Sequence, residues 1–183
     1  MGTTENQSGE DVRGEDLIHD WNTVSGYQPP STKIAFCDET LRDGLQSPSV
    51  TDPSIEKKVE MLHLMESLGI DAVTLGLPGA GPRAVADVTR LVKEISDNNM
   101  KIVPNCAART HENDIMAVAD IAQATGVAVG VNTFIGSSPI RQYTEDWTLE
   151  MMMKHTIGAS KLAAKYELEH MMVTEDTQGK KVS

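Results

Sequence analysis

The sequence is short of basic residues and cysteines and has no long apolar run, and each shortage narrows the possible functions. Its 183 residues include 16 Lys and Arg against 27 Asp and Glu, which gives a formal net charge of −11. This balance argues against nucleic acid or an anionic membrane as a partner, because both bind clustered basic residues. Any anionic substrate must therefore be held by local basic groups.

Two further absences bear on the cellular compartment. The two cysteines, Cys37 and Cys106, are too few for a disulfide framework and fit reduced, buried thiols. No stretch approaches the ~20 apolar residues of a membrane span, and residues 1–11 lack the apolar core of a signal peptide. We therefore expect a cytoplasmic protein that contacts neither nucleic acid nor membrane.

The first 32 residues differ in composition from the rest of the chain. They are rich in Gly, Ser, Asn and acidic residues, and they end in the linker-like sequence QPPS at 28–31. This composition predicts a flexible N-terminal arm over residues 1–32, followed by one structured domain over residues 33–183.

From residue 33 onward, β-prone apolar runs alternate with helical patterns. We expect strands at residues 34–37, 70–75, 101–106, 127–132 and 169–174, with helices over residues 55–68, 85–95, 115–122 and 149–166. A repeat of roughly 30 residues per unit predicts an α/β fold with a parallel sheet. The pattern alone does not distinguish a barrel from an open doubly wound sheet.

Three segments place charged and small residues directly after predicted strands: DETLRDGLQ at 38–46, NTFIGSSPI at 132–140 and VTEDT at 173–177. The first segment resembles the first-strand signature of the metal-dependent acyltransferases and lyases related to 2-isopropylmalate synthase, homocitrate synthase and hydroxymethylglutaryl-CoA lyase. The segment at 132–140 is similar to the fourth-strand segment of the isopropylmalate synthase branch, and the one at 173–177 is similar to the family's fifth-strand segment. This resemblance implies a TIM (β/α)8-type barrel.

The barrel would be incomplete, with about five βα units, because a complete one takes ~250 residues. Open strand edges and an uncovered interior face are a liability. We therefore expect a fragment of a longer enzyme, or closure by a homodimer partner or by a second chain that supplies the missing half. The family's remaining metal ligands, a His-x-His pair on the seventh strand, have no counterpart in this sequence.

In such a barrel the active site forms at the carboxyl ends of the strands. Candidate residues follow all five predicted strands: Arg42, Asp43 and Gln46; Thr74; Arg109; Thr133 and Ser137; Glu175 and Thr177. This convergence is the main structural reason to expect a site.

The resemblance implies central roles for three charged residues. Asp43 would be a ligand of a divalent metal ion, Mg²⁺, Mn²⁺ or Zn²⁺. Arg42 would stabilise negative charge on a substrate carbonyl oxygen, with a structural bridge to Glu39 or Glu175 as the alternative. Glu175 would act near the bound oxo acid or only order Arg42. Arg42 and Asp43 are adjacent, so they are not a helical ion pair. We expect them to direct opposite charges at one small ligand or metal, with a solvated salt bridge in a loop as the alternative.

The resemblance also implies contacts to substrate. Gln46 would hydrogen-bond the 2-oxo acid, Arg109 would hold a substrate carboxylate, and Ser137 would shape the mouth of an acyl-CoA channel. The structural alternatives are a turn contact for Gln46, a salt bridge for Arg109 and turn capping around Ser137. The remaining substrate-binding candidates are Thr74, Thr133 and Thr177.

Two departures from the family pattern indicate an unusual acceptor: Thr74 stands where Glu is usual, and Gln178 where Arg is common. The implied function is an acyltransferase that condenses acetyl-CoA with a 2-oxo acid in a Claisen-type reaction, giving a 2-hydroxy di- or tricarboxylic acid. A lyase of the hydroxymethylglutaryl-CoA type is an alternative against which residues 132–140 argue. A non-catalytic half barrel is another, because one carboxylate cannot hold a metal in an ordered geometry.

Overall fold

The computed structural model describes residues 31–176. Nearly all of the predicted N-terminal arm lies outside the described residues, as do Thr177 and Gln178. Every described helix and strand lies within the unit Ala35–Ser183.

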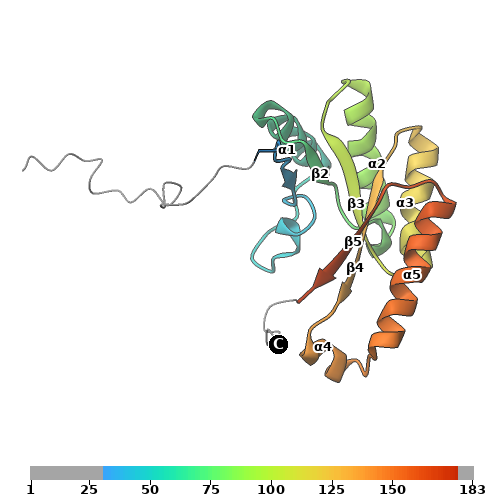
Figure 1. The fold of residues 1–183 in the computed structure, drawn as a ribbon. Coiled ribbons are helices and arrows are strands. Elements are labelled where there is room, and N and C mark those ends of the chain that lie inside the picture. The colour runs from blue at the N-terminus through green and yellow to red at the C-terminus, as the bar shows by residue number, and fades with distance from the viewer. Residues whose placement is uncertain (1–30, 177–183) are drawn as a thin grey trace, which may run out of the picture. The chain divides into compact units, whose positions relative to one another are not determined.

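Five strands form one parallel sheet whose spatial order follows the sequence (Figure 1). They are β1 (Cys37–Asp38), β2 (Ala72–Thr74), β3 (Val103–Arg109), β4 (Gly130–Gly136) and β5 (His170–Glu175). Each strand pairs only with its neighbours in the sequence, which is the strand order of a barrel wall rather than of a doubly wound sheet.

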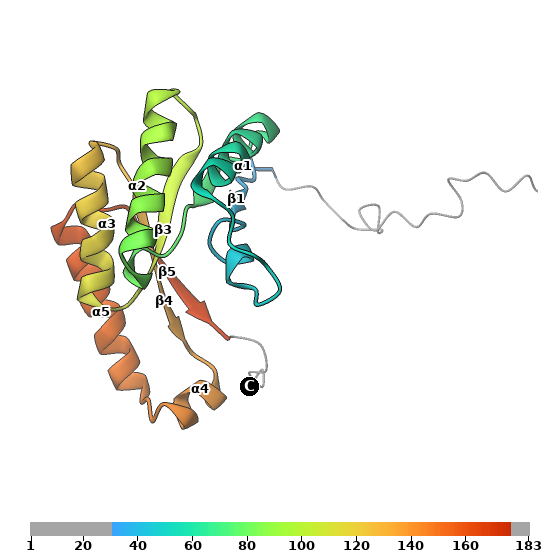
Figure 2. The same cartoon turned by 180° about the vertical axis from the view of Figure 1, so that it is seen from behind.

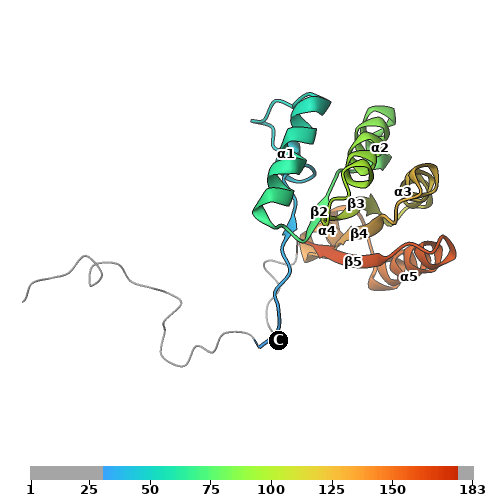
Figure 3. The same ribbon diagram turned by 90° about the horizontal axis from the view of Figure 1, so that it is seen from above.

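Four long helices connect the strands: α1 (Ile55–Leu68), α2 (Pro82–Asp97), α3 (Glu112–Thr125) and α5 (Leu149–Lys165). They follow one another along the outer side of the curled sheet (Figure 3). The fold is therefore a half barrel of the (β/α)8 type with about five βα units. The predicted fold class is confirmed, and the open doubly wound alternative is wrong.

The helix ends follow local sequence signals. Gly69 and Gly126 close α1 and α3 with φ of 77° and 69°, the left-handed conformation that a residue without Cβ adopts most easily. An additional short helix, α4 (Pro139–Thr144), begins where the Ser138 hydroxyl accepts a hydrogen bond from the amide of Arg141 at 3.1 Å. The turn capping considered for this segment is therefore present.

The apolar core lies between the outer face of the sheet and the helices. Leu62 of α1, Val73 of β2 and Val131 of β4 are fully buried there. Successive strand residues point to opposite faces, and on the inner face Val103 is 46% and Met171 50% exposed. Within residues 31–176, no helix has the length and apolar character needed to cross a membrane.

The two cysteines differ in their surroundings. Cys106 is buried on β3, and burial raises the pKa of its thiol to about 12. Cys37 is exposed, so the prediction that both thiols are buried is wrong for this residue. The reason is that β1 is an edge strand, with a paired neighbour on one side only.

Candidate active site

Parallel strands end on the same side of a sheet, so the residues that follow them can meet. Figures 1 and 2 show β4 and β5 pointing to the end of the sheet where α4 lies. The charged segments singled out in the sequence occupy this carboxyl edge.

The segment after β1 folds into a tight turn. The Glu39 carbonyl oxygen accepts hydrogen bonds from the amides of Arg42 at 3.1 Å, Asp43 at 2.7 Å and Gly44 at 3.2 Å. Leu41 is 4% exposed and anchors the turn in the core. The turn continues into a short 3-10 helix, Gly44–Gln46. Arg42 and Asp43 are thus held at the strand end by backbone geometry.

Arg42 connects three strands. Its Nη1 donates to Asp43 Oδ1 at 3.0 Å, and its Nη2 donates to Glu175 Oε1 on β5 at 3.4 Å. The guanidinium also lies over the Phe134 ring on β4, 5.2 Å from the ring centroid. Its Nε is buried and has no hydrogen-bond partner within residues 31–176. The considered bridge to Glu175 is therefore present, while one donor nitrogen is unused.

Asp43 is the candidate metal ligand. Its side chain is 69% exposed and is paired with Arg42. In the described part of the chain, no three His, Cys, Asp or Glu side chains gather closely enough to hold a metal ion. These residues therefore provide one suitable oxygen ligand and not a complete metal site.

Thr74 and Gln46 lie near this turn. The Thr74 side chain is buried, and its hydroxyl donates to Glu39 Oε1 at 2.6 Å. A carboxylate thus reaches this position from the end of β1, although Thr74 stands where the family usually has Glu. Gln46 is exposed and lines a pocket of about 160 Å³ that also includes Arg42.

Arg109 ends β3 and forms the salt bridge considered for it. Its Nε and Nη2 each donate to the Asp114 carboxylate at 2.8 Å. Burial raises the pKa of Asp114, but the hydrogen bonds from Arg109 outweigh burial and hold the pKa below its usual value. The same hydrogen bonds raise the pKa of Arg109.

Two predicted substrate contacts make structural bonds between β4 and β5. Thr133 is fully buried, and its Oγ1 lies 2.7 Å from His170 Nε2 and 3.3 Å from Met172 Sδ. Strand alternation places Thr133 on the face opposite to Phe134, and so away from Arg42. Ser137 donates through its hydroxyl to the Glu175 carbonyl at 3.2 Å. Neither residue joins the cluster around Arg42, and Thr177 lies outside the described residues.

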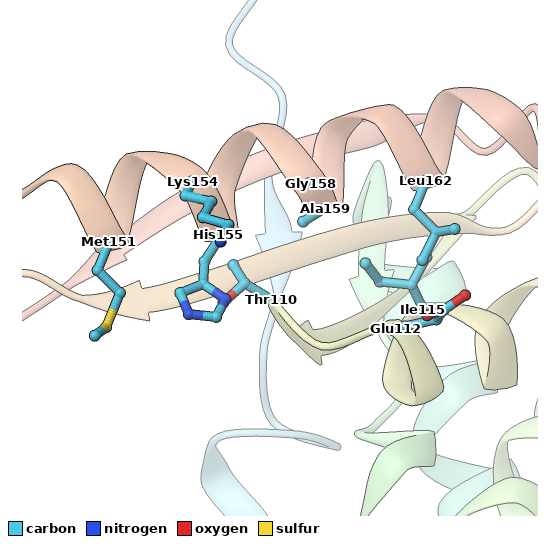
Figure 4. Close-up of a pocket in the computed structure, with 9 residues that line it drawn as sticks. All are labelled: Thr110, Glu112, Ile115, Met151, Lys154, His155, Gly158, Ala159 and Leu162. Carbon is cyan, nitrogen blue, oxygen red and sulfur yellow. The ribbon is translucent and has the colours of Figure 1, made fainter.

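One pocket borders the cluster, and a second pocket adjoins the first. The first, which we call the strand-end pocket, has a volume of about 310 Å³ and is lined by Arg109, Thr110, His111, Phe134, Ile135, Gly136, Arg141, Trp147, His155 and Glu175. The second, of about 490 Å³, lies between α3 and α5 and shares Thr110 and His155 with the first. Figure 4 shows His155 of α5 directed toward Thr110, and Leu162 of the same helix directed toward Ile115.

The sequence did not indicate two buried charges that support the edge. Asp114 is 2% exposed, and the Lys58 side chain is 9% exposed. Lys58 Nζ lies 2.8 Å from Asp52 and 2.7 Å from Asp87. Burial lowers the pKa of Lys58, but the hydrogen bonds to both carboxylates outweigh burial and raise the pKa overall. Lys58 falls within the predicted helix 55–68, and Asp114 directly precedes the predicted helix 115–122. At both positions the pattern predicts a charge that is exposed to solvent.

A curled parallel βα sheet with charged side chains at its carboxyl edge is the architecture of a (β/α)8-barrel active site. A family model described as HMGL-like matches residues 33–182. The chain belongs to this family, which confirms the resemblance seen in its strand-end segments.

Several similar proteins are named 2-isopropylmalate synthase. The chain is 27% identical over 149 residues to one from Saccharolobus solfataricus, and this match covers 81% of this chain and 36% of that protein. It is 30% identical over 149 residues to one from Neisseria meningitidis, with coverages of 81% and 26%. It is 34% identical over 110 residues to one from Salinibacter ruber, with coverages of 60% and 19%. The chain thus spans between 19% and 36% of the length of these relatives.

Proposed function

We propose that the chain forms part of the substrate site of an acyltransferase that condenses acetyl-CoA with a 2-oxo acid. The observation that carries this proposal is the Arg42 guanidinium, held among Asp43, Glu175 and Phe134 at the carboxyl edge of a half barrel. Membership of the HMGL-like family and the name of the similar synthases support it.

Arg42 would stabilise the negative charge that develops on the acceptor carbonyl oxygen. A base removes a methyl proton from acetyl-CoA, and the resulting enolate carbon attacks the carbonyl carbon, so that the carbonyl oxygen becomes an alkoxide. Hydrolysis of the thioester then releases CoA. The Nη1 and Nη2 nitrogens of Arg42 each carry a second N–H beyond the bonds to Asp43 and Glu175, and a guanidinium N–H gives a strong hydrogen bond to an oxyanion. Removing one such donor typically lowers the rate by about 10²- to 10³-fold.

Glu175 would keep the Arg42 guanidinium oriented. Its carboxylate approaches Nη2 at 3.4 Å from β5, and the Phe134 ring supports the flat face of the same group. A guanidinium held from two sides loses less entropy when it binds a ligand. Glu175 would then contribute to the reaction through Arg42 and through its place in the strand-end pocket.

A divalent metal ion is part of the proposal only through Asp43. Carboxylate oxygens suit Mg²⁺, Mn²⁺ and Zn²⁺, and Asp43 is exposed enough to bind one. Because residues 31–176 bring no further ligand group together, they do not form a metal site alone. No step above depends on the metal.

A second copy of the chain, or another polypeptide, would cover the open side of the half barrel. Strands β1 and β5 are edges of the described sheet, and its inner face exposes Val103 and Met171. Exposed edges and apolar faces favour association. Light scattering on the purified chain measures the solution mass, and a stable, folded monomer would contradict this part of the proposal.

Calorimetric titration of Mg²⁺ or Mn²⁺ into the purified chain, with and without a 2-oxo acid, tests the proposal. We expect binding that depends on the oxo acid and is lost in Asp43→Ala, together with CoA release from acetyl-CoA that is lost in Arg42→Ala. Asp120→Ala removes an exposed carboxylate of α3 and serves as the matched control. A folded wild-type chain that binds neither metal nor oxo acid would instead favour the non-catalytic half barrel.

A further inference from the structure

Asp114 and Arg109 form an asymmetric pair. The Asp114 carboxylate is 2% exposed, whereas the Arg109 side chain is 60% exposed. Asp114 accepts three hydrogen bonds from Arg109, from the backbone amide at 3.0 Å and from Nε and Nη2 at 2.8 Å each. Within residues 31–176, only the Nη1 nitrogen of this guanidinium has no partner. A bridge that served packing alone would be expected to bury both partners.

Gly79 confines the carboxylate from the other side. It lies in the short helix Pro78–Ala80, and a Cβ at this position would overlap the carboxyl group of Asp114. Asp114 is therefore fixed between Gly79 and Arg109, and it fixes the guanidinium in turn.

Arg109 lies next to the cluster around Arg42. In the strand register its Cα partner is Phe134, so both side chains project from the same face of the sheet. The Phe134 ring lies beneath the Arg42 guanidinium, and Phe134, Arg109 and Glu175 all line the strand-end pocket. Arg109 lines this pocket directly, and Arg42 borders it through its contacts with Phe134 and Glu175.

Arg109 is the basic group of this pocket best placed to receive an anion. Of the other charged lining residues, Glu175 is paired with Arg42, and Arg141 is paired with Glu145 at 3.4 Å and with Asp176 at 3.5 Å. Arg109 keeps its Nη1 donor without a partner within residues 31–176. A planar guanidinium with a fixed orientation is well suited to a carboxylate.

We propose that Asp114 is a positioning residue that holds Arg109 ready for a ligand carboxylate, and that the strand-end pocket takes a 2-oxo acid with a second, distal carboxylate. The inference rests on the proposed function, which places the 2-oxo group at Arg42. It deepens that function by naming the class of acceptor, a 2-oxo dicarboxylic acid rather than one with an aliphatic end.

Two variants disturb the pair in different ways. Asp114→Asn keeps the shape of the side chain and removes its charge, whereas Gly79→Ala keeps the charge and displaces the carboxylate. Asp120→Asn, an exposed position on the same helix, is the matched control. The orientation of Arg109 is followed by NMR through its Nε–Hε signal, which is assigned by its loss in Arg109→Lys. We expect slow hydrogen exchange of this signal in the wild type and the control, and fast exchange in both variants.

Binding of 2-oxoglutarate and 2-oxoisovalerate, measured by calorimetry with Mg²⁺ present, tests the acceptor class. We expect Asp114→Asn and Gly79→Ala to weaken 2-oxoglutarate binding at least about tenfold and to change 2-oxoisovalerate binding less than about twofold. Equal weakening of both acids, or no weakening despite fast exchange at Arg109, overturns the proposal.

Failure of the proposed function gives a different result. A wild-type chain that binds neither oxo acid contradicts the condensation proposal itself. The role of Asp114 is then judged with glutarate, a dicarboxylate without an oxo group. A shift of the Arg109 Nε–Hε signal in the wild type and not in Asp114→Asn supports the role, and no shift in the wild type overturns it.

Discussion

Asp87→Asn should destabilise the protein through Lys58, a cation that the fold has nearly removed from water. The Lys58 side chain is 9% exposed, and its amine binds Asp52 at 2.8 Å and Asp87 at 2.7 Å. Asp52 is itself shared with Arg83. Without the charge of Asp87, which is 20% exposed, Lys58 keeps only a partner that is 41% exposed and divided between two cations.

The expected loss follows from these exposures. Breaking a fully buried ion pair costs about 3–5 kcal/mol, and partial exposure together with the remaining partner places this case at about 2–3 kcal/mol. For a chain of this size, that loss lowers the melting temperature by roughly 4–12 °C. Lys58→Met should cost less, because it removes the buried charge as well as its bonds.

Thermal unfolding followed by circular dichroism measures this difference. The matched control is Asp97→Asn, an exposed carboxylate on the same helix, which should change stability by less than about 0.5 kcal/mol. The prediction is wrong if the melting temperature of Asp87→Asn is no lower than that of Asp97→Asn. It is also wrong if Lys58→Met lowers the melting temperature more than Asp87→Asn does. The first outcome would show that water solvates Lys58 despite its low exposure.

Two further predictions concern the core and pH. Leu62→Ala removes a fully buried side chain of α1 and should lower the free energy of unfolding, measured by urea titration, by about 2–5 kcal/mol. Leu64 is 62% exposed on the same helix, so Leu64→Ala should have little effect in that titration. His170 has its pKa lowered by burial, so the unfolded chain takes up its proton first. Stability should therefore fall as the pH drops below about 6.5, the usual pKa of His. This loss should be smaller in His170→Gln, and an unchanged urea midpoint between pH 7.5 and pH 5 in the wild type would contradict it.

The sequence predicts most of this fold because its signals are local. The apolar spacing of residues 55–68 and the glycine that follows give the observed span of α1, since a helix depends on contacts within a few residues. The order of the strands and the closure into a barrel wall are not local properties. They followed from the resemblance of the strand-end segments, because periodicity is the same in barrels and in doubly wound sheets.

The candidate site is predicted less completely. Arg42 and Glu175 come together as expected, because barrel topology brings the ends of β1 and β5 to the same edge. Thr133 does not join them, because one residue along a strand reverses the direction of the side chain. The predicted strand ends at residue 132, whereas β4 continues to Gly136, so Thr133 lies within the strand rather than after it. Phe134, which the sequence analysis did not single out, supports the guanidinium.

The residues that the sequence could not indicate share one property: they act through a neighbour rather than on a ligand. Asp114 fixes Arg109, and Lys58 joins Asp52, which precedes α1, to Asp87 on α2. Each is a charge within a helix, where the sequence pattern gives an exposed face. Their burial depends on what the next element brings against them, such as Gly79 against Asp114. A buried charge is tolerated only when its partners are fixed, so each of these charges links a segment at the carboxyl edge to the helix layer behind it. We therefore expect variants at Asp114 to alter ligand binding through the geometry of Arg109, even though the Asp114 side chain does not need to touch the ligand.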